Sequence, residues 1–291
     1  MKVREVPADD LRSLKHATWV DPKRRCLVSG DRAMIPVKEG FAFDREVPER
    51  KPYHGRGFFL IGSTAVIRGQ RPSDLELEEL IKWCRPKCVL WVKSIKGTMR
   101  LPDTCVLMGT PGDVCHRENG VIYHLDPAKV MFAQGNRMER QRMAMTVKLH
   151  PGERVADMCA GIGYFTIPMA VAGAFIHAME INPVAFRYLE RNVRANCVQD
   201  RVIAERGDCR ELLREKYDRL ILGHFSSASM IGSALEHVHR GSVLHIHSIG
   251  QTPPDMAEEV VTAGLNADTN VRVVKKFGPG KWHFVQDLVI R

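Results

Sequence analysis

The pattern of apolar and polar residues is most regular in the second half of the chain. Short apolar runs at residues 154–158, 174–179, 201–205, 219–222 and 242–246 alternate with segments of helical periodicity. Apolar runs of this length are typical of buried strands, and strands that alternate with helices form parallel sheets with helices on both faces. Two more runs, 271–275 and 283–290, flank a Gly-Pro-Gly turn and predict an antiparallel hairpin at one sheet edge.

A smaller α/β arrangement is expected before this sheet. Residues 57–62, 88–92, 106–108 and 121–125 have the pattern of strands, and Ser73 begins a predicted helix at 73–83. We therefore predict a small α/β domain at residues 51–131 and a doubly wound, mostly parallel α/β domain at 132–291. Residues 1–50 combine short apolar runs with many charges, and we predict a basic, irregular N-terminal segment there.

The composition is that of a folded protein with an uneven charge. The 291 residues are 44% hydrophobic and 26% charged, which disfavours a disordered or fibrous chain. The formal net charge of +9 arises within residues 1–150, which hold 27 basic and 18 acidic side chains, because the rest of the chain holds 16 of each. A basic half joined to a neutral half favours a polyanionic partner. The alternative is a surface charge that only keeps the protein soluble.

The strongest candidate for contact with a polyanion is the stretch between Ile81 and Pro102. It has no acid, and it holds two tryptophans and six basic residues: Lys82, Arg85, Lys87, Lys93, Lys96 and Arg100. Basic side chains that follow a phosphate backbone, with aromatic rings on which bases stack, are typical of RNA-binding surfaces. Of the tryptophans, Trp83 is available for stacking, whereas Trp91 lies inside an apolar run and is expected in the core.

Membrane, secreted and metal-binding classes are disfavoured. The uncharged run at residues 158–179 contains three glycines and a proline, so it fits a buried strand, loop and helix better than a membrane span. Residues 1–11 lack the apolar core of a secretory signal. The eight cysteines are scattered without zinc-finger spacing, which favours reduced thiols in a cytoplasmic protein.

Carboxylates follow three successive strands of the predicted parallel sheet. Gly161 and Gly163 form a turn after the first strand, Glu180 ends the second, and Asp208 follows the third. Glycines allow a tight turn close to a ligand, and an acid about twenty residues later is placed to bind both hydroxyls of a ribose. The third carboxylate can accept a hydrogen bond from an adenine amino group. The ordered set predicts an adenosine site at the carboxyl edge of the sheet.

On these residues the chain resembles the class I S-adenosylmethionine-dependent transferases, and more narrowly the enzymes that modify the purine just 3′ of the tRNA anticodon. That group contains guanine N1-methyltransferases and the aminocarboxypropyltransferases of wybutosine synthesis. The resemblance extends from about Gly57 to the C-terminus and rests on FAQGNRMER (132–140), DMCAGIGYFTIP (157–168), EINPVAF (180–186), GDCREL (207–212) and LGHFSSAS (222–229). It implies a Rossmann-like fold and S-adenosylmethionine as cofactor.

The resemblance also implies which residues contact the cofactor. They are Ala133 through its backbone, Arg140 above the cofactor, and residues of the strand-end loops: Asp157, Ala160, Gly161, Gly163, Glu180, Ile181, Asp208, Cys209 and Gly223. Without the resemblance, Arg140 would be interpreted as a surface arginine on a helix, and each strand-end acid as a helix cap.

The sequence after the fourth strand separates the two sister activities. The methyltransferases resemble one another in an Asn-x-Pro motif that holds a planar acceptor nitrogen, whereas this chain has Gly223-His224-Phe225. That sequence resembles the aminocarboxypropyltransferases, which attach the amino-acid arm of the cofactor to C7 of 4-demethylwyosine in tRNA(Phe) and release methylthioadenosine. The sulfonium activates all three attached carbons, so the orientation of the cofactor determines which group is transferred.

These features define a leading hypothesis and two alternatives. The leading one is aminocarboxypropyl transfer next to the tRNA anticodon, by a monomer that needs no membrane and no stable protein partner. The alternatives are a tRNA guanine N1-methyltransferase and an RNA-binding protein without activity. His224 is the candidate for removing a ring proton or contacting the base, and packing is the other interpretation. His245 and His247 share one face of a strand without a nearby carboxylate or cysteine in sequence, so no metal is expected.

Overall fold

The computed structural model describes residues 1–11, 13–24, 26–29, 31–48 and 53–291, and the chain divides into two compact units, Met1–Gly55 and Arg56–Arg291. The first unit holds a four-stranded antiparallel sheet of order β2-β3-β1-β4. Its elements are β1 Lys2–Pro7, η1 Ala8–Leu11, η2 Ser13–His16, β2 Leu27–Ser29, β3 Arg32–Pro36 and β4 Arg45–Glu46. The prediction of an irregular segment at 1–50 is therefore wrong. Its short apolar runs pair with one another, and Val3, Ala33 and Ile35 are buried.

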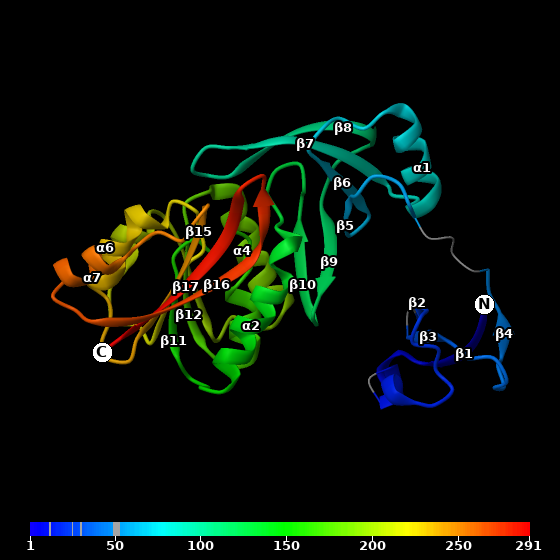
Figure 1. Cartoon of the computed structure of the whole chain (residues 1–291), viewed down its shortest axis with the longest axis horizontal. Coiled ribbons are helices and arrows are strands. Elements are labelled where there is room, and N and C mark those ends of the chain that lie inside the picture. Colours follow the sequence, from blue (N-terminus) through cyan, green and yellow to red (C-terminus); the bar gives the residue numbers. More distant parts are fainter. Residues whose placement is uncertain (12, 25, 30, 49–52) are drawn as a thin grey trace. The chain divides into compact units, whose positions relative to one another are not determined.

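The second unit begins with a four-stranded sheet of order β5-β6-β7-β8 (Figure 1). Its elements are β5 Phe59–Ile61, β6 Thr64–Arg68, α1 Asp74–Cys84, β7 Cys88–Lys96 and β8 Leu101–Gly109. The helix begins with a capping box, in which the Ser73 hydroxyl accepts from the Glu76 N–H and the Glu76 carboxylate accepts from the Ser73 N–H. Strands β7 and β8 form a long ribbon, and its tip at residues 97–100 contributes to the site described below.

A two-stranded hairpin links this sheet to the rest of the unit. Strand β9, Val114–Glu118, pairs with β10, Val121–Leu125. The side-chain oxygens of Asn192 and Asn196 accept hydrogen bonds from the backbone N–H groups of His124 (2.6 Å) and Ile122 (2.8 Å). These bonds fix the hairpin against the main domain. The small sheet, the hairpin and the main domain together form one compact unit, Arg56–Arg291.

The main sheet has seven strands in the order β13-β12-β11-β14-β15-β17-β16. Strands β11, β12, β13, β14 and β15 are mutually parallel, and β17 runs antiparallel to both β15 and β16. Their bounds are β11 Arg154–Asp157, β12 Phe175–Glu180, β13 Val202–Arg206, β14 Arg219–Leu222, β15 Val243–Gly250, β16 Ala267–Gly278 and β17 Lys281–Ile290. The predicted fold class, a doubly wound, mostly parallel sheet with an antiparallel hairpin at one edge, is confirmed.

Helices cover both faces of the sheet. On one side lie α2 Arg137–Lys148, α3 Thr166–Ala172 and α4 Pro183–Ala195, and on the other lie α5 Cys209–Leu212, α6 Ile231–Leu235 and α7 Ala257–Thr262, with η3 Gln134–Asn136 and η4 Ser227–Met230 in the connections (Figure 1). Successive side chains of a strand point to opposite faces of the sheet and so pack into two cores: Val155 lies in one and Ala156 in the other. No helix within the described ranges is long and apolar enough to cross a membrane.

Candidate cofactor-binding and active site

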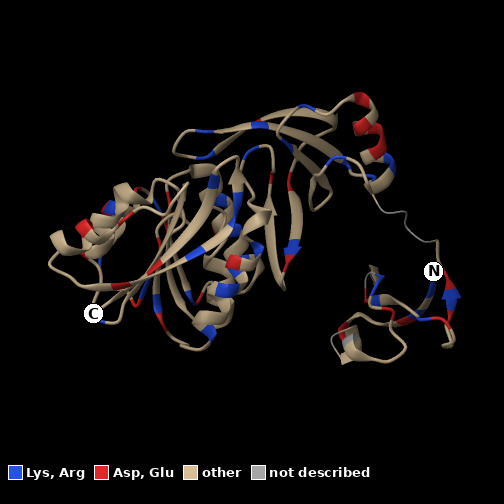
Figure 2. Cartoon of the chain, viewed as in Figure 1, with Lys and Arg blue, Asp and Glu red and all other residues tan. Residues whose placement is uncertain are grey.

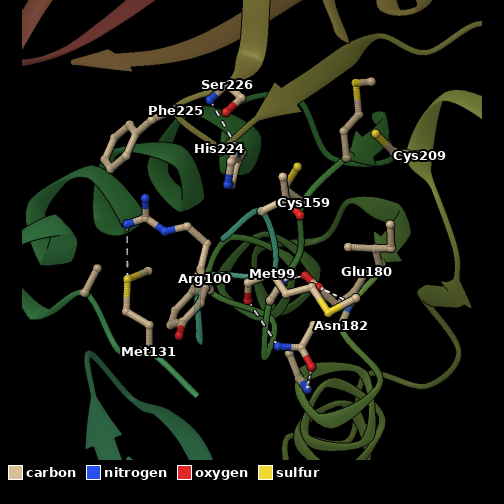
Figure 3. Close-up of a pocket in the computed structure, with 18 of the residues that line it drawn as sticks. Met99, Arg100, Met131, Cys159, Glu180, Asn182, Cys209, His224, Phe225 and Ser226 are labelled. Carbon is tan, nitrogen blue, oxygen red and sulfur yellow. Dashed lines mark hydrogen bonds between the residues drawn. The ribbon is translucent and has the colours of Figure 1, made fainter. Parts of the chain in front are cut away.

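A cavity of about 320 Å³ lies where the strand order reverses, between β11 and β14. Open α/β sheets bind ligands at this switch point, outside the carboxyl ends of the strands, and the volume is within the range of small-molecule sites. Loops after β11, β12, β13 and β14 form one part of its wall (Figure 3). The tip of the β7–β8 ribbon, the end of β6, residues from 130 to 140 and the end of β16 also contribute to it.

Glu180, at the carboxyl end of β12, presents its carboxylate to this cavity. Its two oxygens accept hydrogen bonds from the backbone N–H groups of Gly161 and Asn182, each at 2.7 Å. Burial raises the pKa of Glu180, and those backbone donors oppose the rise. A carboxylate has about four lone-pair sites, so acceptor capacity remains for the hydroxyls of a ribose.

The glycine turn is needed for this arrangement. Gly161 has a φ of +59°, and a Cβ there would lie 2.5 Å from the Tyr164 ring. A larger residue would therefore displace the N–H that holds the Glu180 carboxylate.

Three predicted cofactor contacts lie behind the cavity wall instead of in it: Asp157, Ala160 and Gly163. Asp157 is fully buried, and its carboxylate accepts from the Thr166 N–H (3.1 Å) and hydroxyl (2.7 Å). Burial raises the pKa of Asp157 to about 6. Its role in this structure is to hold the first turn of α3. The sequence marked it correctly as a strand-end acid, but its side chain points into the domain.

One wall of the cavity, at the ends of β12, β13 and β14, is apolar and rich in sulfur. Cys209, Ile181 and Met230 line it, and the Cys159 and Cys209 sulfurs lie 3.7 and 3.9 Å from the Met230 sulfur. Asp208 also lines the cavity, where it caps α5 and pairs with Arg210. This wall of soft apolar groups beside a carboxylate fits a purine. Together with Glu180 it makes the cavity fit an adenosine.

Arg140 lines the cavity from α2, as the resemblance implies, but it is almost fully buried. Its guanidinium donates to both oxygens of Glu118 in β9, at 2.7 and 2.8 Å, and to the Ala133 carbonyl at 2.9 Å. Ala133 lines the cavity as well. The sequence did not reveal Glu118, because the partner lies 22 positions away on a strand of a different sheet.

Arg100 was predicted to bind RNA, and the structure places it in the cavity. Its guanidinium lies 4.9 Å from the centre of the Phe225 ring and donates to the Met131 sulfur at 3.3 Å. Burial and the neighbouring Arg68 lower the pKa of Arg100. The expected position of Arg100 on the same exposed surface as the lysines is therefore wrong.

The other five residues of the predicted RNA-binding set are exposed: Lys82, Arg85, Lys87, Lys93 and Lys96. Figure 2 shows basic positions along the β7–β8 ribbon and mostly acidic ones on α1. Lys96 pairs with Asp103 at 2.7 Å, and the Lys93 ammonium lies 5.7 Å from the Trp91 ring centre. Trp91 is partly exposed, with its indole N–H bound to the Gly69 carbonyl at 2.9 Å, so its predicted core position is not found.

His224 and Gly223 line the cavity directly after β14. The Nδ1 atom of His224 accepts from the Ser226 N–H at 3.1 Å, and its Nε2 atom is buried without a hydrogen bond to a described residue. Burial, with a contribution from Arg100, lowers the pKa of His224 below its ordinary value, although the Thr98 backbone opposes the lowering, so the neutral ring predominates near pH 7. Because Nδ1 accepts, the proton of the neutral ring resides on Nε2.

The two histidines of β15 are bound elsewhere. His245 bonds to Asp287 (2.5 Å) and Arg219 (2.6 Å), and His247 bonds to His283 (2.9 Å). Within the described part of the chain, no group of three His, Cys, Asp or Glu side chains is arranged to hold a metal ion.

The doubly wound sheet, its glycine turn and its strand-end carboxylates define the class I S-adenosylmethionine-dependent transferases. The chain belongs to the TRM5/TYW2 methyltransferase domain family, whose model matches residues 114–273. It is 33% identical over 242 residues to the tRNA(Phe) (4-demethylwyosine(37)-C(7)) aminocarboxypropyltransferase of Methanocaldococcus jannaschii, a match that covers 78% of this chain and 95% of the relative. It is 36% identical over 213 residues to the protein of the same name from Pyrococcus horikoshii, which covers 69% of this chain and 76% of the relative.

Solved structures give a consistent picture. P. horikoshii TYW2 in complex with MeSAdo is 31% identical, with a TM-score of 0.70, and the match covers 81% of this chain and 91% of that one. M. jannaschii TYW2 in complex with AdoMet is 28% identical, with a TM-score of 0.64 and coverage of 81% and 99%. Trm5b from Pyrococcus abyssi is 27% identical, with a TM-score of 0.71, and covers 100% of this chain and 99% of that one.

Proposed function

We propose that this protein transfers the 3-amino-3-carboxypropyl group of S-adenosylmethionine to C7 of 4-demethylwyosine at position 37 of tRNA(Phe) and releases methylthioadenosine. The observation that carries the proposal is 33% identity across 95% of a relative named for this reaction. The sequence Gly223-His224-Phe225 at the cavity supports it, because this chain lacks an Asn-x-Pro motif there.

The cavity residues have separate roles in this reaction. Bound S-adenosylmethionine supplies a sulfonium that makes the γ-carbon of its amino-acid arm electrophilic. Glu180 accepts from the ribose hydroxyls, and Ile181, Cys209 and Met230 enclose the purine. These groups orient the cofactor, and orientation is the main requirement of a reaction whose electrophile is already activated.

His224 contacts the acceptor base as a hydrogen-bond donor. Its Nε2 atom is buried in the cavity without a close hydrogen bond to a described residue, the Thr98 backbone lies near the ring, and the Ser226 N–H occupies Nδ1. The ring in this state has no free lone pair for a proton, so removal of the C7 proton by His224 requires loss of the Ser226 bond. Contact with the base is therefore the role that the geometry supports better.

We propose that the exposed lysines and arginine of α1, of β7 and of the connection between them contact the tRNA near the anticodon, as part of the domain at residues 51–131. Lys82, Arg85, Lys87, Lys93 and Lys96 support this proposal through their exposure and the excess positive charge of the first half of the chain. We also propose a monomer in the cytoplasm, and the scattered spacing of the cysteines in the sequence favours that compartment. Sedimentation with and without tRNA tests the monomer.

A second candidate function is guanine N1-methylation. The observation in its favour is that the Trm5b match covers the whole chain, whereas the TYW2 structures cover 81%, a share equal to that of residues 56–291. The full-length match to Trm5b favours this candidate, whereas the absence of the Asn-x-Pro motif after β14 argues against it.

Doubly labelled cofactor distinguishes these functions. The protein is incubated with tRNA(Phe) that carries either guanosine or 4-demethylwyosine at position 37, and with S-adenosylmethionine labelled separately in the methyl group and in the carboxyl carbon. We expect carboxyl label in the 4-demethylwyosine tRNA and methyl label in methylthioadenosine. Methyl label in the guanosine tRNA would instead establish the methyltransferase, and RNA binding without either label would leave only an RNA-binding protein.

A further inference from the structure

The hairpin of β16 and β17 is a long stretch with basic residues and no acids. Between Asp268 and Asp287 the sequence contains neither aspartate nor glutamate. The basic residues of this stretch, which forms the hairpin (Figure 1), are Arg272, Lys275, Lys276 and Lys281. The stretch between Ile81 and Pro102, for which RNA contact is proposed, has the same kind of composition. Positive charge without neighbouring acids favours a polyanionic partner.

Two of these four basic side chains are directed into the domain and two are exposed. Arg272 pairs with a carboxylate of β17, and Lys275 lines the cavity and donates to the Asn136 side-chain oxygen at 2.7 Å. Lys276 and Lys281 are exposed, and neither has an ion pair among the described residues. The positive charge at the turn of the hairpin is therefore available to a ligand.

Two large aromatic side chains at the same turn are exposed. Phe277 is 51% exposed and Trp282 is 40% exposed, whereas the apolar residues that follow in β17 are buried or partly buried. The indole N–H of Trp91 is bound to a carbonyl, but that of Trp282 has no hydrogen bond to a described residue. Exposed aromatic rings beside basic side chains are the combination on which single-stranded nucleic acids bind, with bases on the rings and phosphates at the cations.

The register of the hairpin places Trp282 beside Lys276. The two residues are opposite each other in the antiparallel pair, so their side chains share one face. The register shifts by one residue after Lys276, which makes Phe277 a bulge residue without a partner in β17. Phe277 lines the cavity and packs against Phe225, with ring centres 5.7 Å apart. The bulge thus turns one aromatic ring to the cavity and leaves the other outside it.

The turn of the hairpin lies at the same sheet edge as the cavity. Trp282 is opposite Gly250, the last residue of β15. Because β15 runs parallel to β14, Gly250 is at the carboxyl edge of the parallel strands, and residues 278–281 extend past it. The tip of the β7–β8 ribbon reaches the same place, since the Arg100 guanidinium lies 4.9 Å from the centre of the Phe225 ring. Two hairpin tips from different sheets therefore border one cavity.

We propose that the tip of the β16–β17 hairpin, residues 276–282, binds the RNA strand beside the nucleotide that enters the cavity. Trp282 stacks on a base next to that nucleotide, and Lys276 and Lys281 contact the phosphates. This inference rests on the proposed function, because it requires a tRNA substrate.

A stack on Trp282 offsets part of the cost of moving a base into the cavity. A base that enters an active site leaves its stack, and its neighbour then loses a stacking partner. The indole ring replaces that partner beside the cavity. The other tip follows the strand that carries Lys93 and Lys96, so contacts at both tips hold the RNA strand at the cavity.

Trp282→Leu tests the stack, because leucine keeps an apolar side chain and removes the aromatic face. We would measure binding of tRNA(Phe) with guosine or 4-demethylwyosine at position 37, and the fluorescence of 2-aminopurine placed directly before or after that nucleotide. Trp282→Leu should bind the tRNA about 5- to 150-fold more weakly, as expected for one base–aromatic stack, and should abolish the quenching of 2-aminopurine at one of the two places. Trp282→Phe should restore most of both effects. Phe175→Leu is the matched control, since Phe175 is 49% exposed at the beginning of β12, on the opposite edge of the sheet.

Lys276→Ala with Lys281→Ala tests the phosphate contacts. The double variant should bind tRNA more weakly and reduce the salt slope by about 1.4, because each phosphate contact on a single strand contributes about 0.7. Lys148→Ala with Lys216→Ala removes the same charge from exposed positions that precede β11 and β14, and it should keep the wild-type slope. Every variant should keep the wild-type affinity for methylthioadenosine in calorimetry, which shows that the cavity remains folded.

Two results would overturn the proposal. A tRNA affinity of Trp282→Leu equal to that of Phe175→Leu would show that Trp282 does not stack on the RNA and would assign the exposed tip to another partner. A wild-type salt slope for the variant that lacks Lys276 and Lys281 would remove the phosphate contacts. The labelling experiment is independent: weaker tRNA binding by Trp282→Leu together with methyl transfer to the tRNA would refute the proposed function and leave the RNA-binding hairpin standing.

Discussion

Replacement of Glu118 by Gln tests whether one buried ion pair holds the wall of the cavity. The side chains of Arg140 and Glu118 are 2% and 6% exposed, and two hydrogen bonds of 2.7 and 2.8 Å join them. Glutamine keeps the shape and one acceptor oxygen but leaves the buried guanidinium without a counter-charge. Removal of one partner of a buried pair costs about 3–5 kcal/mol, and the retained oxygen places this variant near the lower value.

The free energy of unfolding, measured by urea titration with tryptophan fluorescence, checks this value. Glu78→Gln is the matched control, since Glu78 and Lys82 form an exposed pair at 3.6 Å and exposed pairs contribute about 0.5 kcal/mol or less. The double variant Glu118→Leu/Arg140→Met should recover much of the lost stability but not cofactor binding. A loss for Glu118→Gln no greater than that of the control would refute the reasoning.

Three further predictions concern the ribose contact, acid stability and RNA binding. Glu180→Gln should weaken methylthioadenosine binding about tenfold or more in calorimetry, and unchanged affinity would contradict the ribose contact. Burial and Lys275 lower the pKa of His283 to about 4, whereas an unfolded histidine titrates near pH 6.5, so the unfolded chain takes up this proton first. The contribution of the neutral His283 ring to the free energy of unfolding should thus be fully present above pH 6.5 and fall by about 3 kcal/mol toward pH 4. His283→Asn should flatten that fall in urea titrations. Lys93→Ala with Lys96→Ala should weaken tRNA binding and reduce its salt slope by about 1.5–2 in filter binding, with methylthioadenosine affinity as control. An unchanged slope would remove these lysines from the interface.

The adenosine end of the cavity could be predicted because it is built from local sequence. Strands of a parallel sheet end at one edge, so Gly161, Glu180 and Asp208 had to lie near one another once the strands were assigned. The same reasoning fails for Asp157. Which face a strand-end side chain takes depends on one position of the alternation, and Asp157 points toward Thr166 in the interior.

The cationic part of the cavity, formed by Arg68, Arg100 and Lys275, could not be predicted because these residues come from distant parts of the chain. Arg68 ends β6, Arg100 is at the tip of the β7–β8 ribbon, and Lys275 follows a bulge in β16. No local period marks a bulge, and charge alone placed Arg100 with the surface lysines. Cavity walls that depend on how two sheets meet are visible only in the folded chain.

Contacts between the main sheet and the small sheet also bear on how one cavity can favour transfer of the amino-acid arm of the cofactor. The Asn182 side chain, next to Glu180, donates to the Met99 carbonyl at 3.2 Å, and Gln134 donates to the Leu60 carbonyl at 2.8 Å. The main sheet thus supplies Glu180, and the small sheet brings Arg100 to the same cavity at a fixed position. On the proposed function, Glu180 accepts from the neutral ribose hydroxyls of the cofactor, and Arg100 lies on another side of the same cavity. Because the sulfonium activates all three attached carbons, the one that is attacked depends on how these fixed walls orient the cofactor.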